Sequence, residues 1–169
     1  MCRRKGEVNR MKTLEEIVKQ EPVYLNYWSE KFDVVADFEG IYMTKKEYEA
    51  TESPYPNKAV WLEKKEVMRR ALEEKYKDVN ILFASYGTEY YEGDAWVLFE
   101  QNGKLYEVHG SHCSWYGLED QWEPEEVDLV ELENRLLNGT FGEDFSGNNF
   151  KKELCEFLGV TFKSNIEHY

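Results

Sequence analysis

The chain has 169 residues, 15% of them aromatic, and a net charge of −13 at pH 7. This length suits one domain with a sizeable core, and no run of 18 apolar residues or signal peptide is present. Its three cysteines lack paired spacing, which argues against a disulfide framework. We therefore expect a reduced, cytoplasmic protein: a disordered basic lead-in over residues 1–10, then one α+β domain over residues 11–169.

The N-terminal third predicts short helices. Thr13 and Glu16 form a capping box, so a helix follows Thr13 and ends before Pro22. Thr44 and Glu47 form a second capping box, for a short helix reaching about residue 50. The aromatic stretch over residues 24–38 is left without an assignment. A longer helix, capped by an asparagine, is expected over about residues 57–77 because apolar residues recur along one stripe of it.

The central stretch Val79–Tyr116 combines strand, turn and motif signals. Asn102-Gly103 separates two runs rich in β-branched and aromatic residues, and Asn-Gly favours a type I′ hairpin turn. This turn places Gln101 opposite Lys104 and sets the register of the whole hairpin. With a further apolar run before it, the stretch predicts a three-stranded antiparallel meander with strands at about 79–86, 94–101 and 104–109.

Alternation along the two hairpin strands separates two faces of the sheet. One face is apolar and consists of Val97, Phe99, Tyr106 and Val108. The opposite face is expected to be half solvated and consists of Trp96, Leu98, Glu100, Leu105, Glu107 and His109.

Two more helices are expected after the meander. Pro124 suits the first position of a helix, and Glu125 and Glu126 would complement the positive end of its dipole. Gly139 would end this helix. A last helix is expected over about residues 149–158.

The acidity is concentrated in the C-terminal half. Residues 88–169 hold 18 acidic residues against 5 basic ones, with the highest density between Glu119 and Asp144. Such a chain should repel nucleic acid and anionic membranes and favour basic partners. A helix face with acidic turns beside it could imitate the phosphates of duplex DNA, whereas the simpler interpretation is a solvated surface that aids solubility. The candidate acidic contact residues are Glu119, Asp120, Glu123, Glu125, Glu126, Asp128 and Glu131.

Aromatic residues are frequent in the predicted loops. Tyr90, Tyr91 and Trp115 are candidate partner contacts, because aromatic side chains are enriched at the centres of interfaces. The alternative is packing against the core, which we expect for about half of the aromatic residues in loops.

His109, His112 and Cys113 supply three candidate metal-ligating atoms, with Cys155 or His168 as a fourth. Adjacent residues rarely bind one tetrahedral ion, and the chain has no second close pair of ligands, so we expect packing roles and no metal. Cys113 could also act as a nucleophile. No oxyanion hole, phosphate loop or other catalytic motif accompanies it, so no catalytic residue is assigned.

The run GKLYEVHGSHCSWYGLEDQWEPEE, Gly103–Glu126, resembles a family of small uncharacterised bacteriophage proteins. The resemblance covers about residues 94–137. The family commonly has a second cysteine where this chain has Trp115, which weakens a Cys-x-Cys metal or redox role. What the resemblance implies is a setting, an infected bacterial cell, and no activity.

We therefore expect a phage-encoded acidic protein that inhibits a host or anti-phage defence protein by occupying its basic surface, with no cofactor and with homo-oligomerisation left open. One alternative is a protein that sequesters a nucleotide second messenger. Its pocket would be lined by Tyr90, Tyr91, His109, His112, Cys113 and Tyr116. A second alternative is a metal- or thiol-dependent enzyme centred on Cys113.

Overall fold

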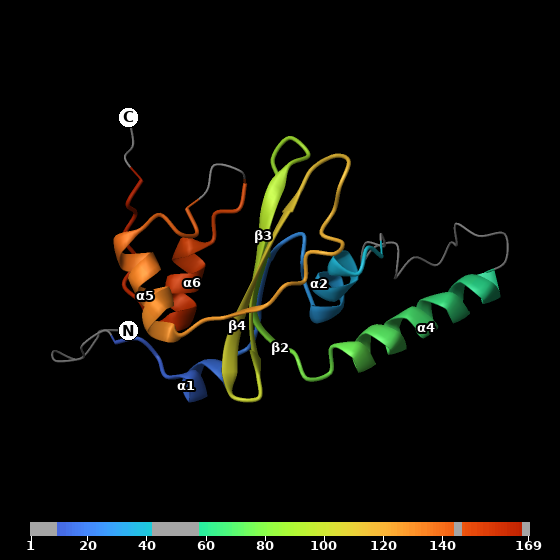
Figure 1. The fold of residues 1–169 in the computed structure, drawn as a ribbon, viewed down its shortest axis with the longest axis horizontal. Coiled ribbons are helices and arrows are strands. Elements are labelled where there is room, and N and C mark those ends of the chain that lie inside the picture. Colours follow the sequence, from blue (N-terminus) through green and yellow to red (C-terminus); the bar gives the residue numbers. More distant parts are fainter. Residues whose placement is uncertain (1–9, 42–57, 144–146, 167–169) are drawn as a thin grey trace, which may run out of the picture.

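The computed structural model of the chain describes residues 10–41, 58–143 and 147–166, and over these ranges it is an α+β fold built on one sheet (Figure 1). The sheet has the strand order β1-β2-β3-β4-β5. Its strands are β1 (Val23–Asn26), β2 (Asn80–Tyr86), β3 (Gly93–Gln101), β4 (Lys104–His112) and β5 (Glu125–Glu126). β1 runs parallel to β2, and all other neighbouring strands are antiparallel.

The hairpin between β3 and β4 has the register that the Asn-Gly turn predicts. Gln101 lies opposite Lys104, and the pairing continues without interruption to the other end of both strands. Asn102 and Gly103 have φ values of 53° and 80°, as a type I′ turn requires at both central positions.

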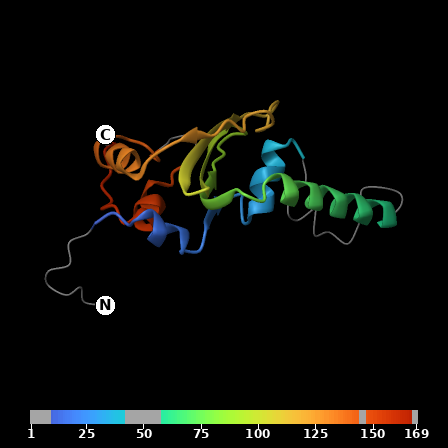
Figure 2. The same cartoon turned by 60° about the horizontal axis from the view of Figure 1, so that its bottom comes forward.

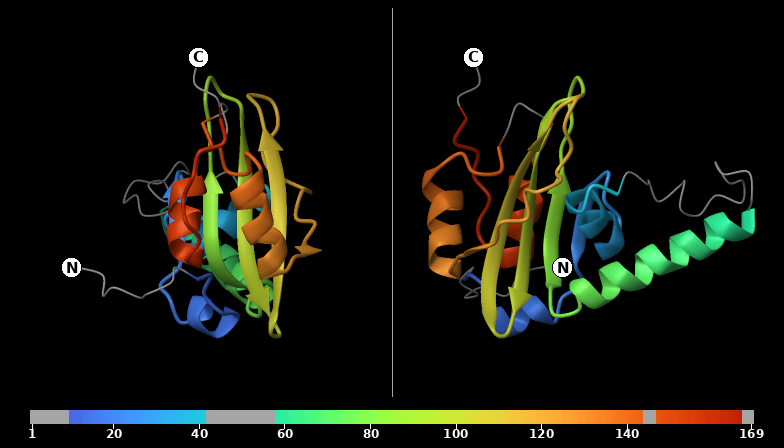
Figure 3. Two further views of the ribbon diagram at one scale, coloured as in Figure 1. Left: turned by 90° about the vertical axis from the view of Figure 1, so that its left-hand side faces the viewer. Right: turned by 45° about the vertical axis from the view of Figure 1, so that its right-hand side comes forward.

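Helices cover both faces of the sheet (Figures 1 and 3). On one face lie α2 (Lys31–Phe38) and α4 (Lys58–Lys75), and on the other lie α1 (Leu14–Val18), α5 (Leu129–Asn138) and α6 (Lys151–Leu158). Each face has its own hydrophobic core because side chains alternate along the strands. The first core includes Phe38, Tyr76, Val97, Phe99 and Val108. The second includes Ile17, Trp96, Leu98, Leu132 and Leu154.

Local capping explains several helix ends. The Thr13 side chain accepts a hydrogen bond from the backbone N–H of Glu16 at 3.2 Å and so caps α1 as predicted. Gly159 ends α6 in the left-handed conformation, with φ 82°. The Lys31 ammonium donates to the backbone oxygens of Tyr76 and Val79, which joins α2 to the end of α4. From this junction, α4 leads away from the sheet (Figure 2).

The α+β class is confirmed, but the sheet has five strands where a three-stranded meander was predicted. At one edge, β1 comes from the stretch left unassigned. At the other, Glu125 and Glu126 form β5 against Tyr106 and Glu107. The prediction of a helix starting at Pro124 is therefore wrong: the helix begins at Leu129, because pairing with the exposed edge of β4 satisfies the backbone groups of β5.

The face of the hairpin that was expected to be half solvated is largely buried. Trp96, Leu98 and Leu105 are at most 5% exposed because α5 and α6 pack over them. This expectation was wrong because the two helices come from later in the sequence, and alternation along a strand does not reveal what covers each face.

Four predictions fall on residues that the structure does not describe: the lead-in over residues 1–10 except Arg10, the helix after Thr44, the Asn57 cap, and His168 as a fourth metal ligand. Along the rest of the chain, no helix has the length and apolar character needed to cross a membrane.

Candidate functional site

Exposed aromatic side chains gather at one end of the sheet, where β1, β2 and β4 end and β3 begins. Tyr27 follows β1, Tyr90 and Tyr91 form the tip of the β2–β3 loop, and Trp115 and Tyr116 lie in the loop after β4. All five are more than 70% exposed. The two loops lie together because Gly93 of β3 pairs with His112 of β4 (Figure 1, top). We call these five residues the aromatic end.

The tip of the β2–β3 loop has an unfavourable backbone conformation. Glu89 and Glu92 exchange two backbone hydrogen bonds, of 2.7 and 3.0 Å, around the two tyrosines. Tyr90 and Tyr91 have φ values of 51° and 66°. This is a type I′ turn, whose central positions favour Asn and Gly, and a left-handed conformation costs other residues about 1–2 kcal/mol each. The turn therefore presents two large aromatic side chains to solvent at a cost in stability.

Beneath the tips, buried side chains hold the aromatic end in place. The rings of Tyr86 and His112 stack with centroids 4.3 Å apart, and the edge of Tyr27 packs on Tyr86. His112 also bonds through Nε2 to the backbone oxygen of Gly87, at 2.6 Å. This ring nitrogen must donate the proton, since a carbonyl only accepts. The two loops are thus tied to each other through His112.

From the aromatic end, the chain runs back along the outer side of β4 and carries the acidic residues with it. Gln121 is hydrogen-bonded to both backbone groups of Ser111, and β5 then pairs with the middle of β4. We call the exposed carboxylates of this segment the acidic edge. They are Asp120, Glu123, Glu125, Glu126, Asp128 and Glu131. Six of the seven predicted acidic contacts are thus exposed along the segment that follows the β4 edge of the sheet into α5, and Glu119 is half-buried.

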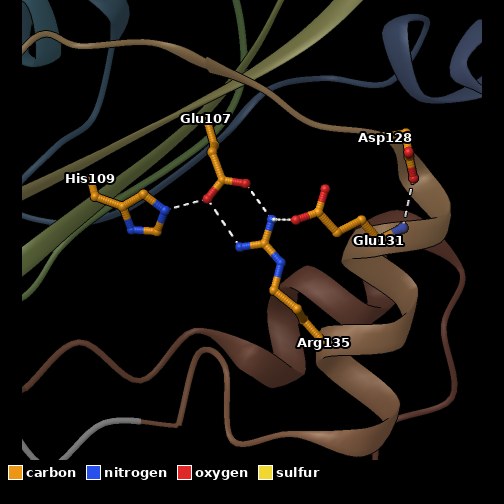
Figure 4. Close-up of polar contacts among 5 residues, drawn as sticks. All are labelled: Glu107, His109, Asp128, Glu131 and Arg135. Carbon is orange, nitrogen blue, oxygen red and sulfur yellow. Dashed lines mark hydrogen bonds and ion pairs between the residues drawn. The ribbon is translucent and has the colours of Figure 1, made fainter.

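Some carboxylates of the acidic edge also stabilise the fold. Asp128 caps α5, accepting a hydrogen bond from the backbone N–H of Glu131 at 2.7 Å (Figure 4). Glu131 also pairs with Arg135 at 3.6 Å, and Glu126 pairs with Lys104 at 3.7 Å. Exposed pairs of this kind contribute little free energy to the fold. Glu123 and Glu125 have no such pair among the ion pairs of the described residues.

A buried carboxylate connects the sheet to α5 (Figure 4). Glu107 of β4 accepts hydrogen bonds from the guanidinium of Arg135, one of them 3.0 Å long, and also contacts His109 through Nε2. Burial by itself would raise the pKa of Glu107, but the hydrogen bonds from His109 and Arg135 and the charge of Arg135 lower it to about 2. Glu107 therefore stays ionised, and His109 must keep a proton on Nε2.

The structure separates the residues of the predicted His-Cys cluster. His109 lies on the face covered by α5, beside Glu107, whereas His112 packs against Tyr86 toward the opposite face. Residues three positions apart on a strand point to opposite faces, so this separation could have been read from the sequence. Cys113 is half-buried, and its backbone N–H donates to the oxygen of Tyr116. Over the described part of the chain, no three His, Cys, Asp or Glu side chains are placed to hold a metal ion.

Comparison with known proteins assigns no function to this arrangement of residues. No family model, no curated protein and no solved structure matches the chain. The bacteriophage resemblance therefore stays an expectation, and the function has to be argued from the aromatic end, the acidic edge and the pocket beside them.

Sequence reasoning missed the role of Glu107 and Arg135. An acidic residue in the middle of a strand, with apolar residues on both sides, was a signal for a buried charge that needs a partner. The partner could not be found in the sequence, since Arg135 lies 28 residues later on a different element.

Proposed function

We propose that the protein is a binding protein that captures a partner protein through the aromatic end, while the acidic edge selects a partner with a basic surface. A basic groove that normally holds nucleic acid is a surface of this kind. In the setting that the bacteriophage resemblance implies, the partner is a host or defence protein, and capture inhibits it.

The observation that carries the proposal is the Tyr90–Tyr91 turn. Both side chains are more than 80% exposed in a backbone conformation that disfavours them, and neither makes a ring contact within the described structure. No contact within the described structure therefore explains tyrosine at these positions. Strained residues that persist without a structural benefit are typical of functional sites. Tyrosine is also among the residues that contribute most to binding energy when an interface buries them.

The acidic edge supports a basic partner because it begins where the aromatic end stops. Trp115 and Tyr116 are followed within four residues by Glu119 and Asp120. A partner seated on the aromatic rings would therefore also meet the carboxylates beside them. The electrostatic field of these carboxylates would mainly raise the rate of association with a basic partner and exclude acidic competitors. Its effect decreases as the salt concentration rises.

Capture from a bacterial lysate tests the proposal when matched variants are compared. The wild-type chain is expected to retain a protein that Tyr90→Asn/Tyr91→Gly and Trp115→Ala lose. The triple change of Glu123, Glu125 and Glu126 to Gln should weaken capture mainly at low salt. As the control, Glu15, Glu153 and Glu156 are changed to Gln, which removes the same charge from exposed positions on α1 and α6.

The captured protein should also lose its binding to nucleic acid when the wild-type chain is added. If capture is equally strong in all four variants, or is lost equally in the control, the aromatic end and the acidic edge are not the contact surface. An enzyme centred on Cys113 would instead show an activity that Cys113→Ala abolishes and that the three interface variants retain.

A further inference from the structure

A cavity of about 430 Å³ lies on the α5/α6 face of the sheet, close to the aromatic end. Its floor is formed by two pairs of residues that lie opposite each other in the β3–β4 register. These pairs are Asp94 with Ser111 and, next on the same face, Trp96 with His109. Phe141 and Asn148, both from the connection between α5 and α6, contribute to the opposite wall. The volume falls within the range typical of small-molecule sites. Of the ligand-binding residues expected from the sequence, the cavity includes only His109.

Two donors of this wall, one of them fully buried, have no hydrogen-bond partner among the described residues. The indole N–H of Trp96 is buried and has no hydrogen-bond partner. Asn148 is 2% exposed; its side-chain oxygen accepts from the hydroxyl of Ser85 at 2.5 Å, and its amide NH₂ has no partner among the described residues. An unpaired buried donor costs about 1–3 kcal/mol, so natural folds rarely keep one without a reason. A ligand with acceptor atoms would satisfy the amide of Asn148.

His109 adds an acceptor to the same cavity. Its Nε2 is occupied by Glu107, which is ionised and so requires a proton on that nitrogen. In the neutral ring Nδ1 is then an acceptor, and Figure 4 shows this second nitrogen turned away from Glu107. The hydroxyl of Ser111 can donate or accept beside it. The cavity therefore offers donors and acceptors together.

The charge of the lining excludes one class of ligand. No lysine or arginine is part of the lining, whereas Asp94 is. A phosphate group is usually bound by lysine or arginine, and the lining supplies neither. The rings of Phe141, Phe150 and Trp96 pack against one another and form an apolar wall, which suits a flat ring system.

We propose that this cavity binds an uncharged planar heterocycle that carries both donors and acceptors, such as the base of a nucleoside without its phosphate. The ligand's acceptors meet the side-chain amide of Asn148, one of its N–H groups meets Nδ1 of His109, and the ligand lies close enough to Trp96 to change the environment of its indole. The site is separate from the aromatic end, and the proposal stands without the protein-binding role. It differs from a nucleotide second-messenger site, which needs cations for phosphate.

Amide and indole NMR spectra of the full chain, titrated with adenosine, guanosine, cytidine and uridine, test the proposal. The chain has five tryptophans, and the indole N–H signal of Trp96 is identified by its absence from the Trp96→Phe spectrum. At least one nucleoside should move that signal and raise the melting temperature. The corresponding 5′-monophosphate should bind several-fold more weakly.

Variants of the lining should respond differently from a neighbour outside it. His109→Ala and Ser111→Ala each remove one hydrogen bond and should weaken nucleoside binding by roughly three- to tenfold. Ser114→Ala, an exposed change in the loop that follows, should leave it unchanged. Melting temperatures without ligand show that each variant folds.

Three results would overturn the site: no nucleoside moves the Trp96 indole signal at millimolar concentration, the monophosphates bind more tightly than the nucleosides, or both lining variants bind as the wild type does. If the nucleosides bind and capture of a partner protein fails, the cavity stands and the function proposed above does not. The opposite pattern removes the cavity and leaves the protein-binding role.

Discussion

Arg135 of α5 donates two hydrogen bonds to the carboxylate of Glu107 on β4, and this pair fixes the helix to the sheet. The Glu107 side chain is 5% exposed and that of Arg135 is 27% exposed. The guanidinium also lies over the ring of Phe141, 4.9 Å from its centroid. One ion pair thus positions α5, the start of the α5–α6 connection and one wall of the cavity.

Replacing Glu107 with Gln should destabilise the fold by about 2–3 kcal/mol, because Arg135 loses its buried counter-charge and keeps only the exposed carboxylate of Glu131. The free energy of unfolding from urea denaturation measures the change. Glu100→Gln is the control, because Glu100 lies on β3 on the same face of the sheet as Glu107 but is more exposed. This change should alter the stability by less than about 0.5 kcal/mol. Equal effects of the two changes would contradict a special role for the buried pair.

The same carboxylate predicts a pH dependence. The pKa of Glu107 is about 2 in the folded chain, below its ordinary value of 4.5. A group whose folded pKa is depressed stabilises the fold fully above its unfolded pKa and loses this contribution as the pH falls through the folded pKa. The difference in stability between wild type and Glu107→Gln should therefore narrow from pH 4.5 toward pH 2. A difference that stays constant over this window would show that the folded pKa is not depressed.

Replacing Tyr90-Tyr91 with Asn-Gly should make the isolated protein more stable, by about 1–2 kcal/mol, because Asn and Gly suit the left-handed conformations of a type I′ turn. Urea denaturation measures this gain. Tyr116→Ala, at an exposed position of the neighbouring loop, should leave stability nearly unchanged. A loss of stability in the Asn-Gly variant would mean that the tyrosines support the fold, and would remove the main argument for a binding role.

Asp128 should stabilise α5 as a cap and not through its charge. Asp128→Ala is expected to cost about 1 kcal/mol, whereas Asp128→Ser keeps a side-chain oxygen for the backbone N–H of Glu131 and should cost only a few tenths. Thermal unfolding distinguishes the two. If both variants lose the same stability, the charge of Asp128 at the helix dipole is the larger effect. The serine variant is then the suitable one for capture assays, since it removes the charge and retains the cap.

The central hairpin was predictable because its determinants are local. Asn102-Gly103 sets the turn, and alternation of the residues on both sides assigns each side chain to a face. The acidic edge was predictable as a set of residues for a related reason: its members are close in sequence, so any path of the chain keeps them near one another. The individual roles of these residues were not predictable, since the sequence alone does not distinguish the helix cap Asp128 from its exposed neighbours.

The sequence pattern did not predict which distant segments pair in the sheet. β1 and β5 are short, with four and two residues, and gain their conformation from the strand beside them instead of from their own propensity. The burial of Trp96 depends in the same way on helices that follow it by more than 30 residues. Local propensity carries no information about which distant surface will cover a face.

The amino-acid sequence by itself determined the α+β class, the hairpin register, the cap of α1 and the concentration of acid in the C-terminal half, because each depends on residues a few positions apart. The contact between Glu107 and Arg135 and the gathering of Tyr27, Tyr90 and Trp115 at one end of the sheet follow only from the tertiary structure. These relations depend on how strands align and which helices cover them. Packing of the whole chain sets that arrangement, since each face of the sheet has to be removed from water.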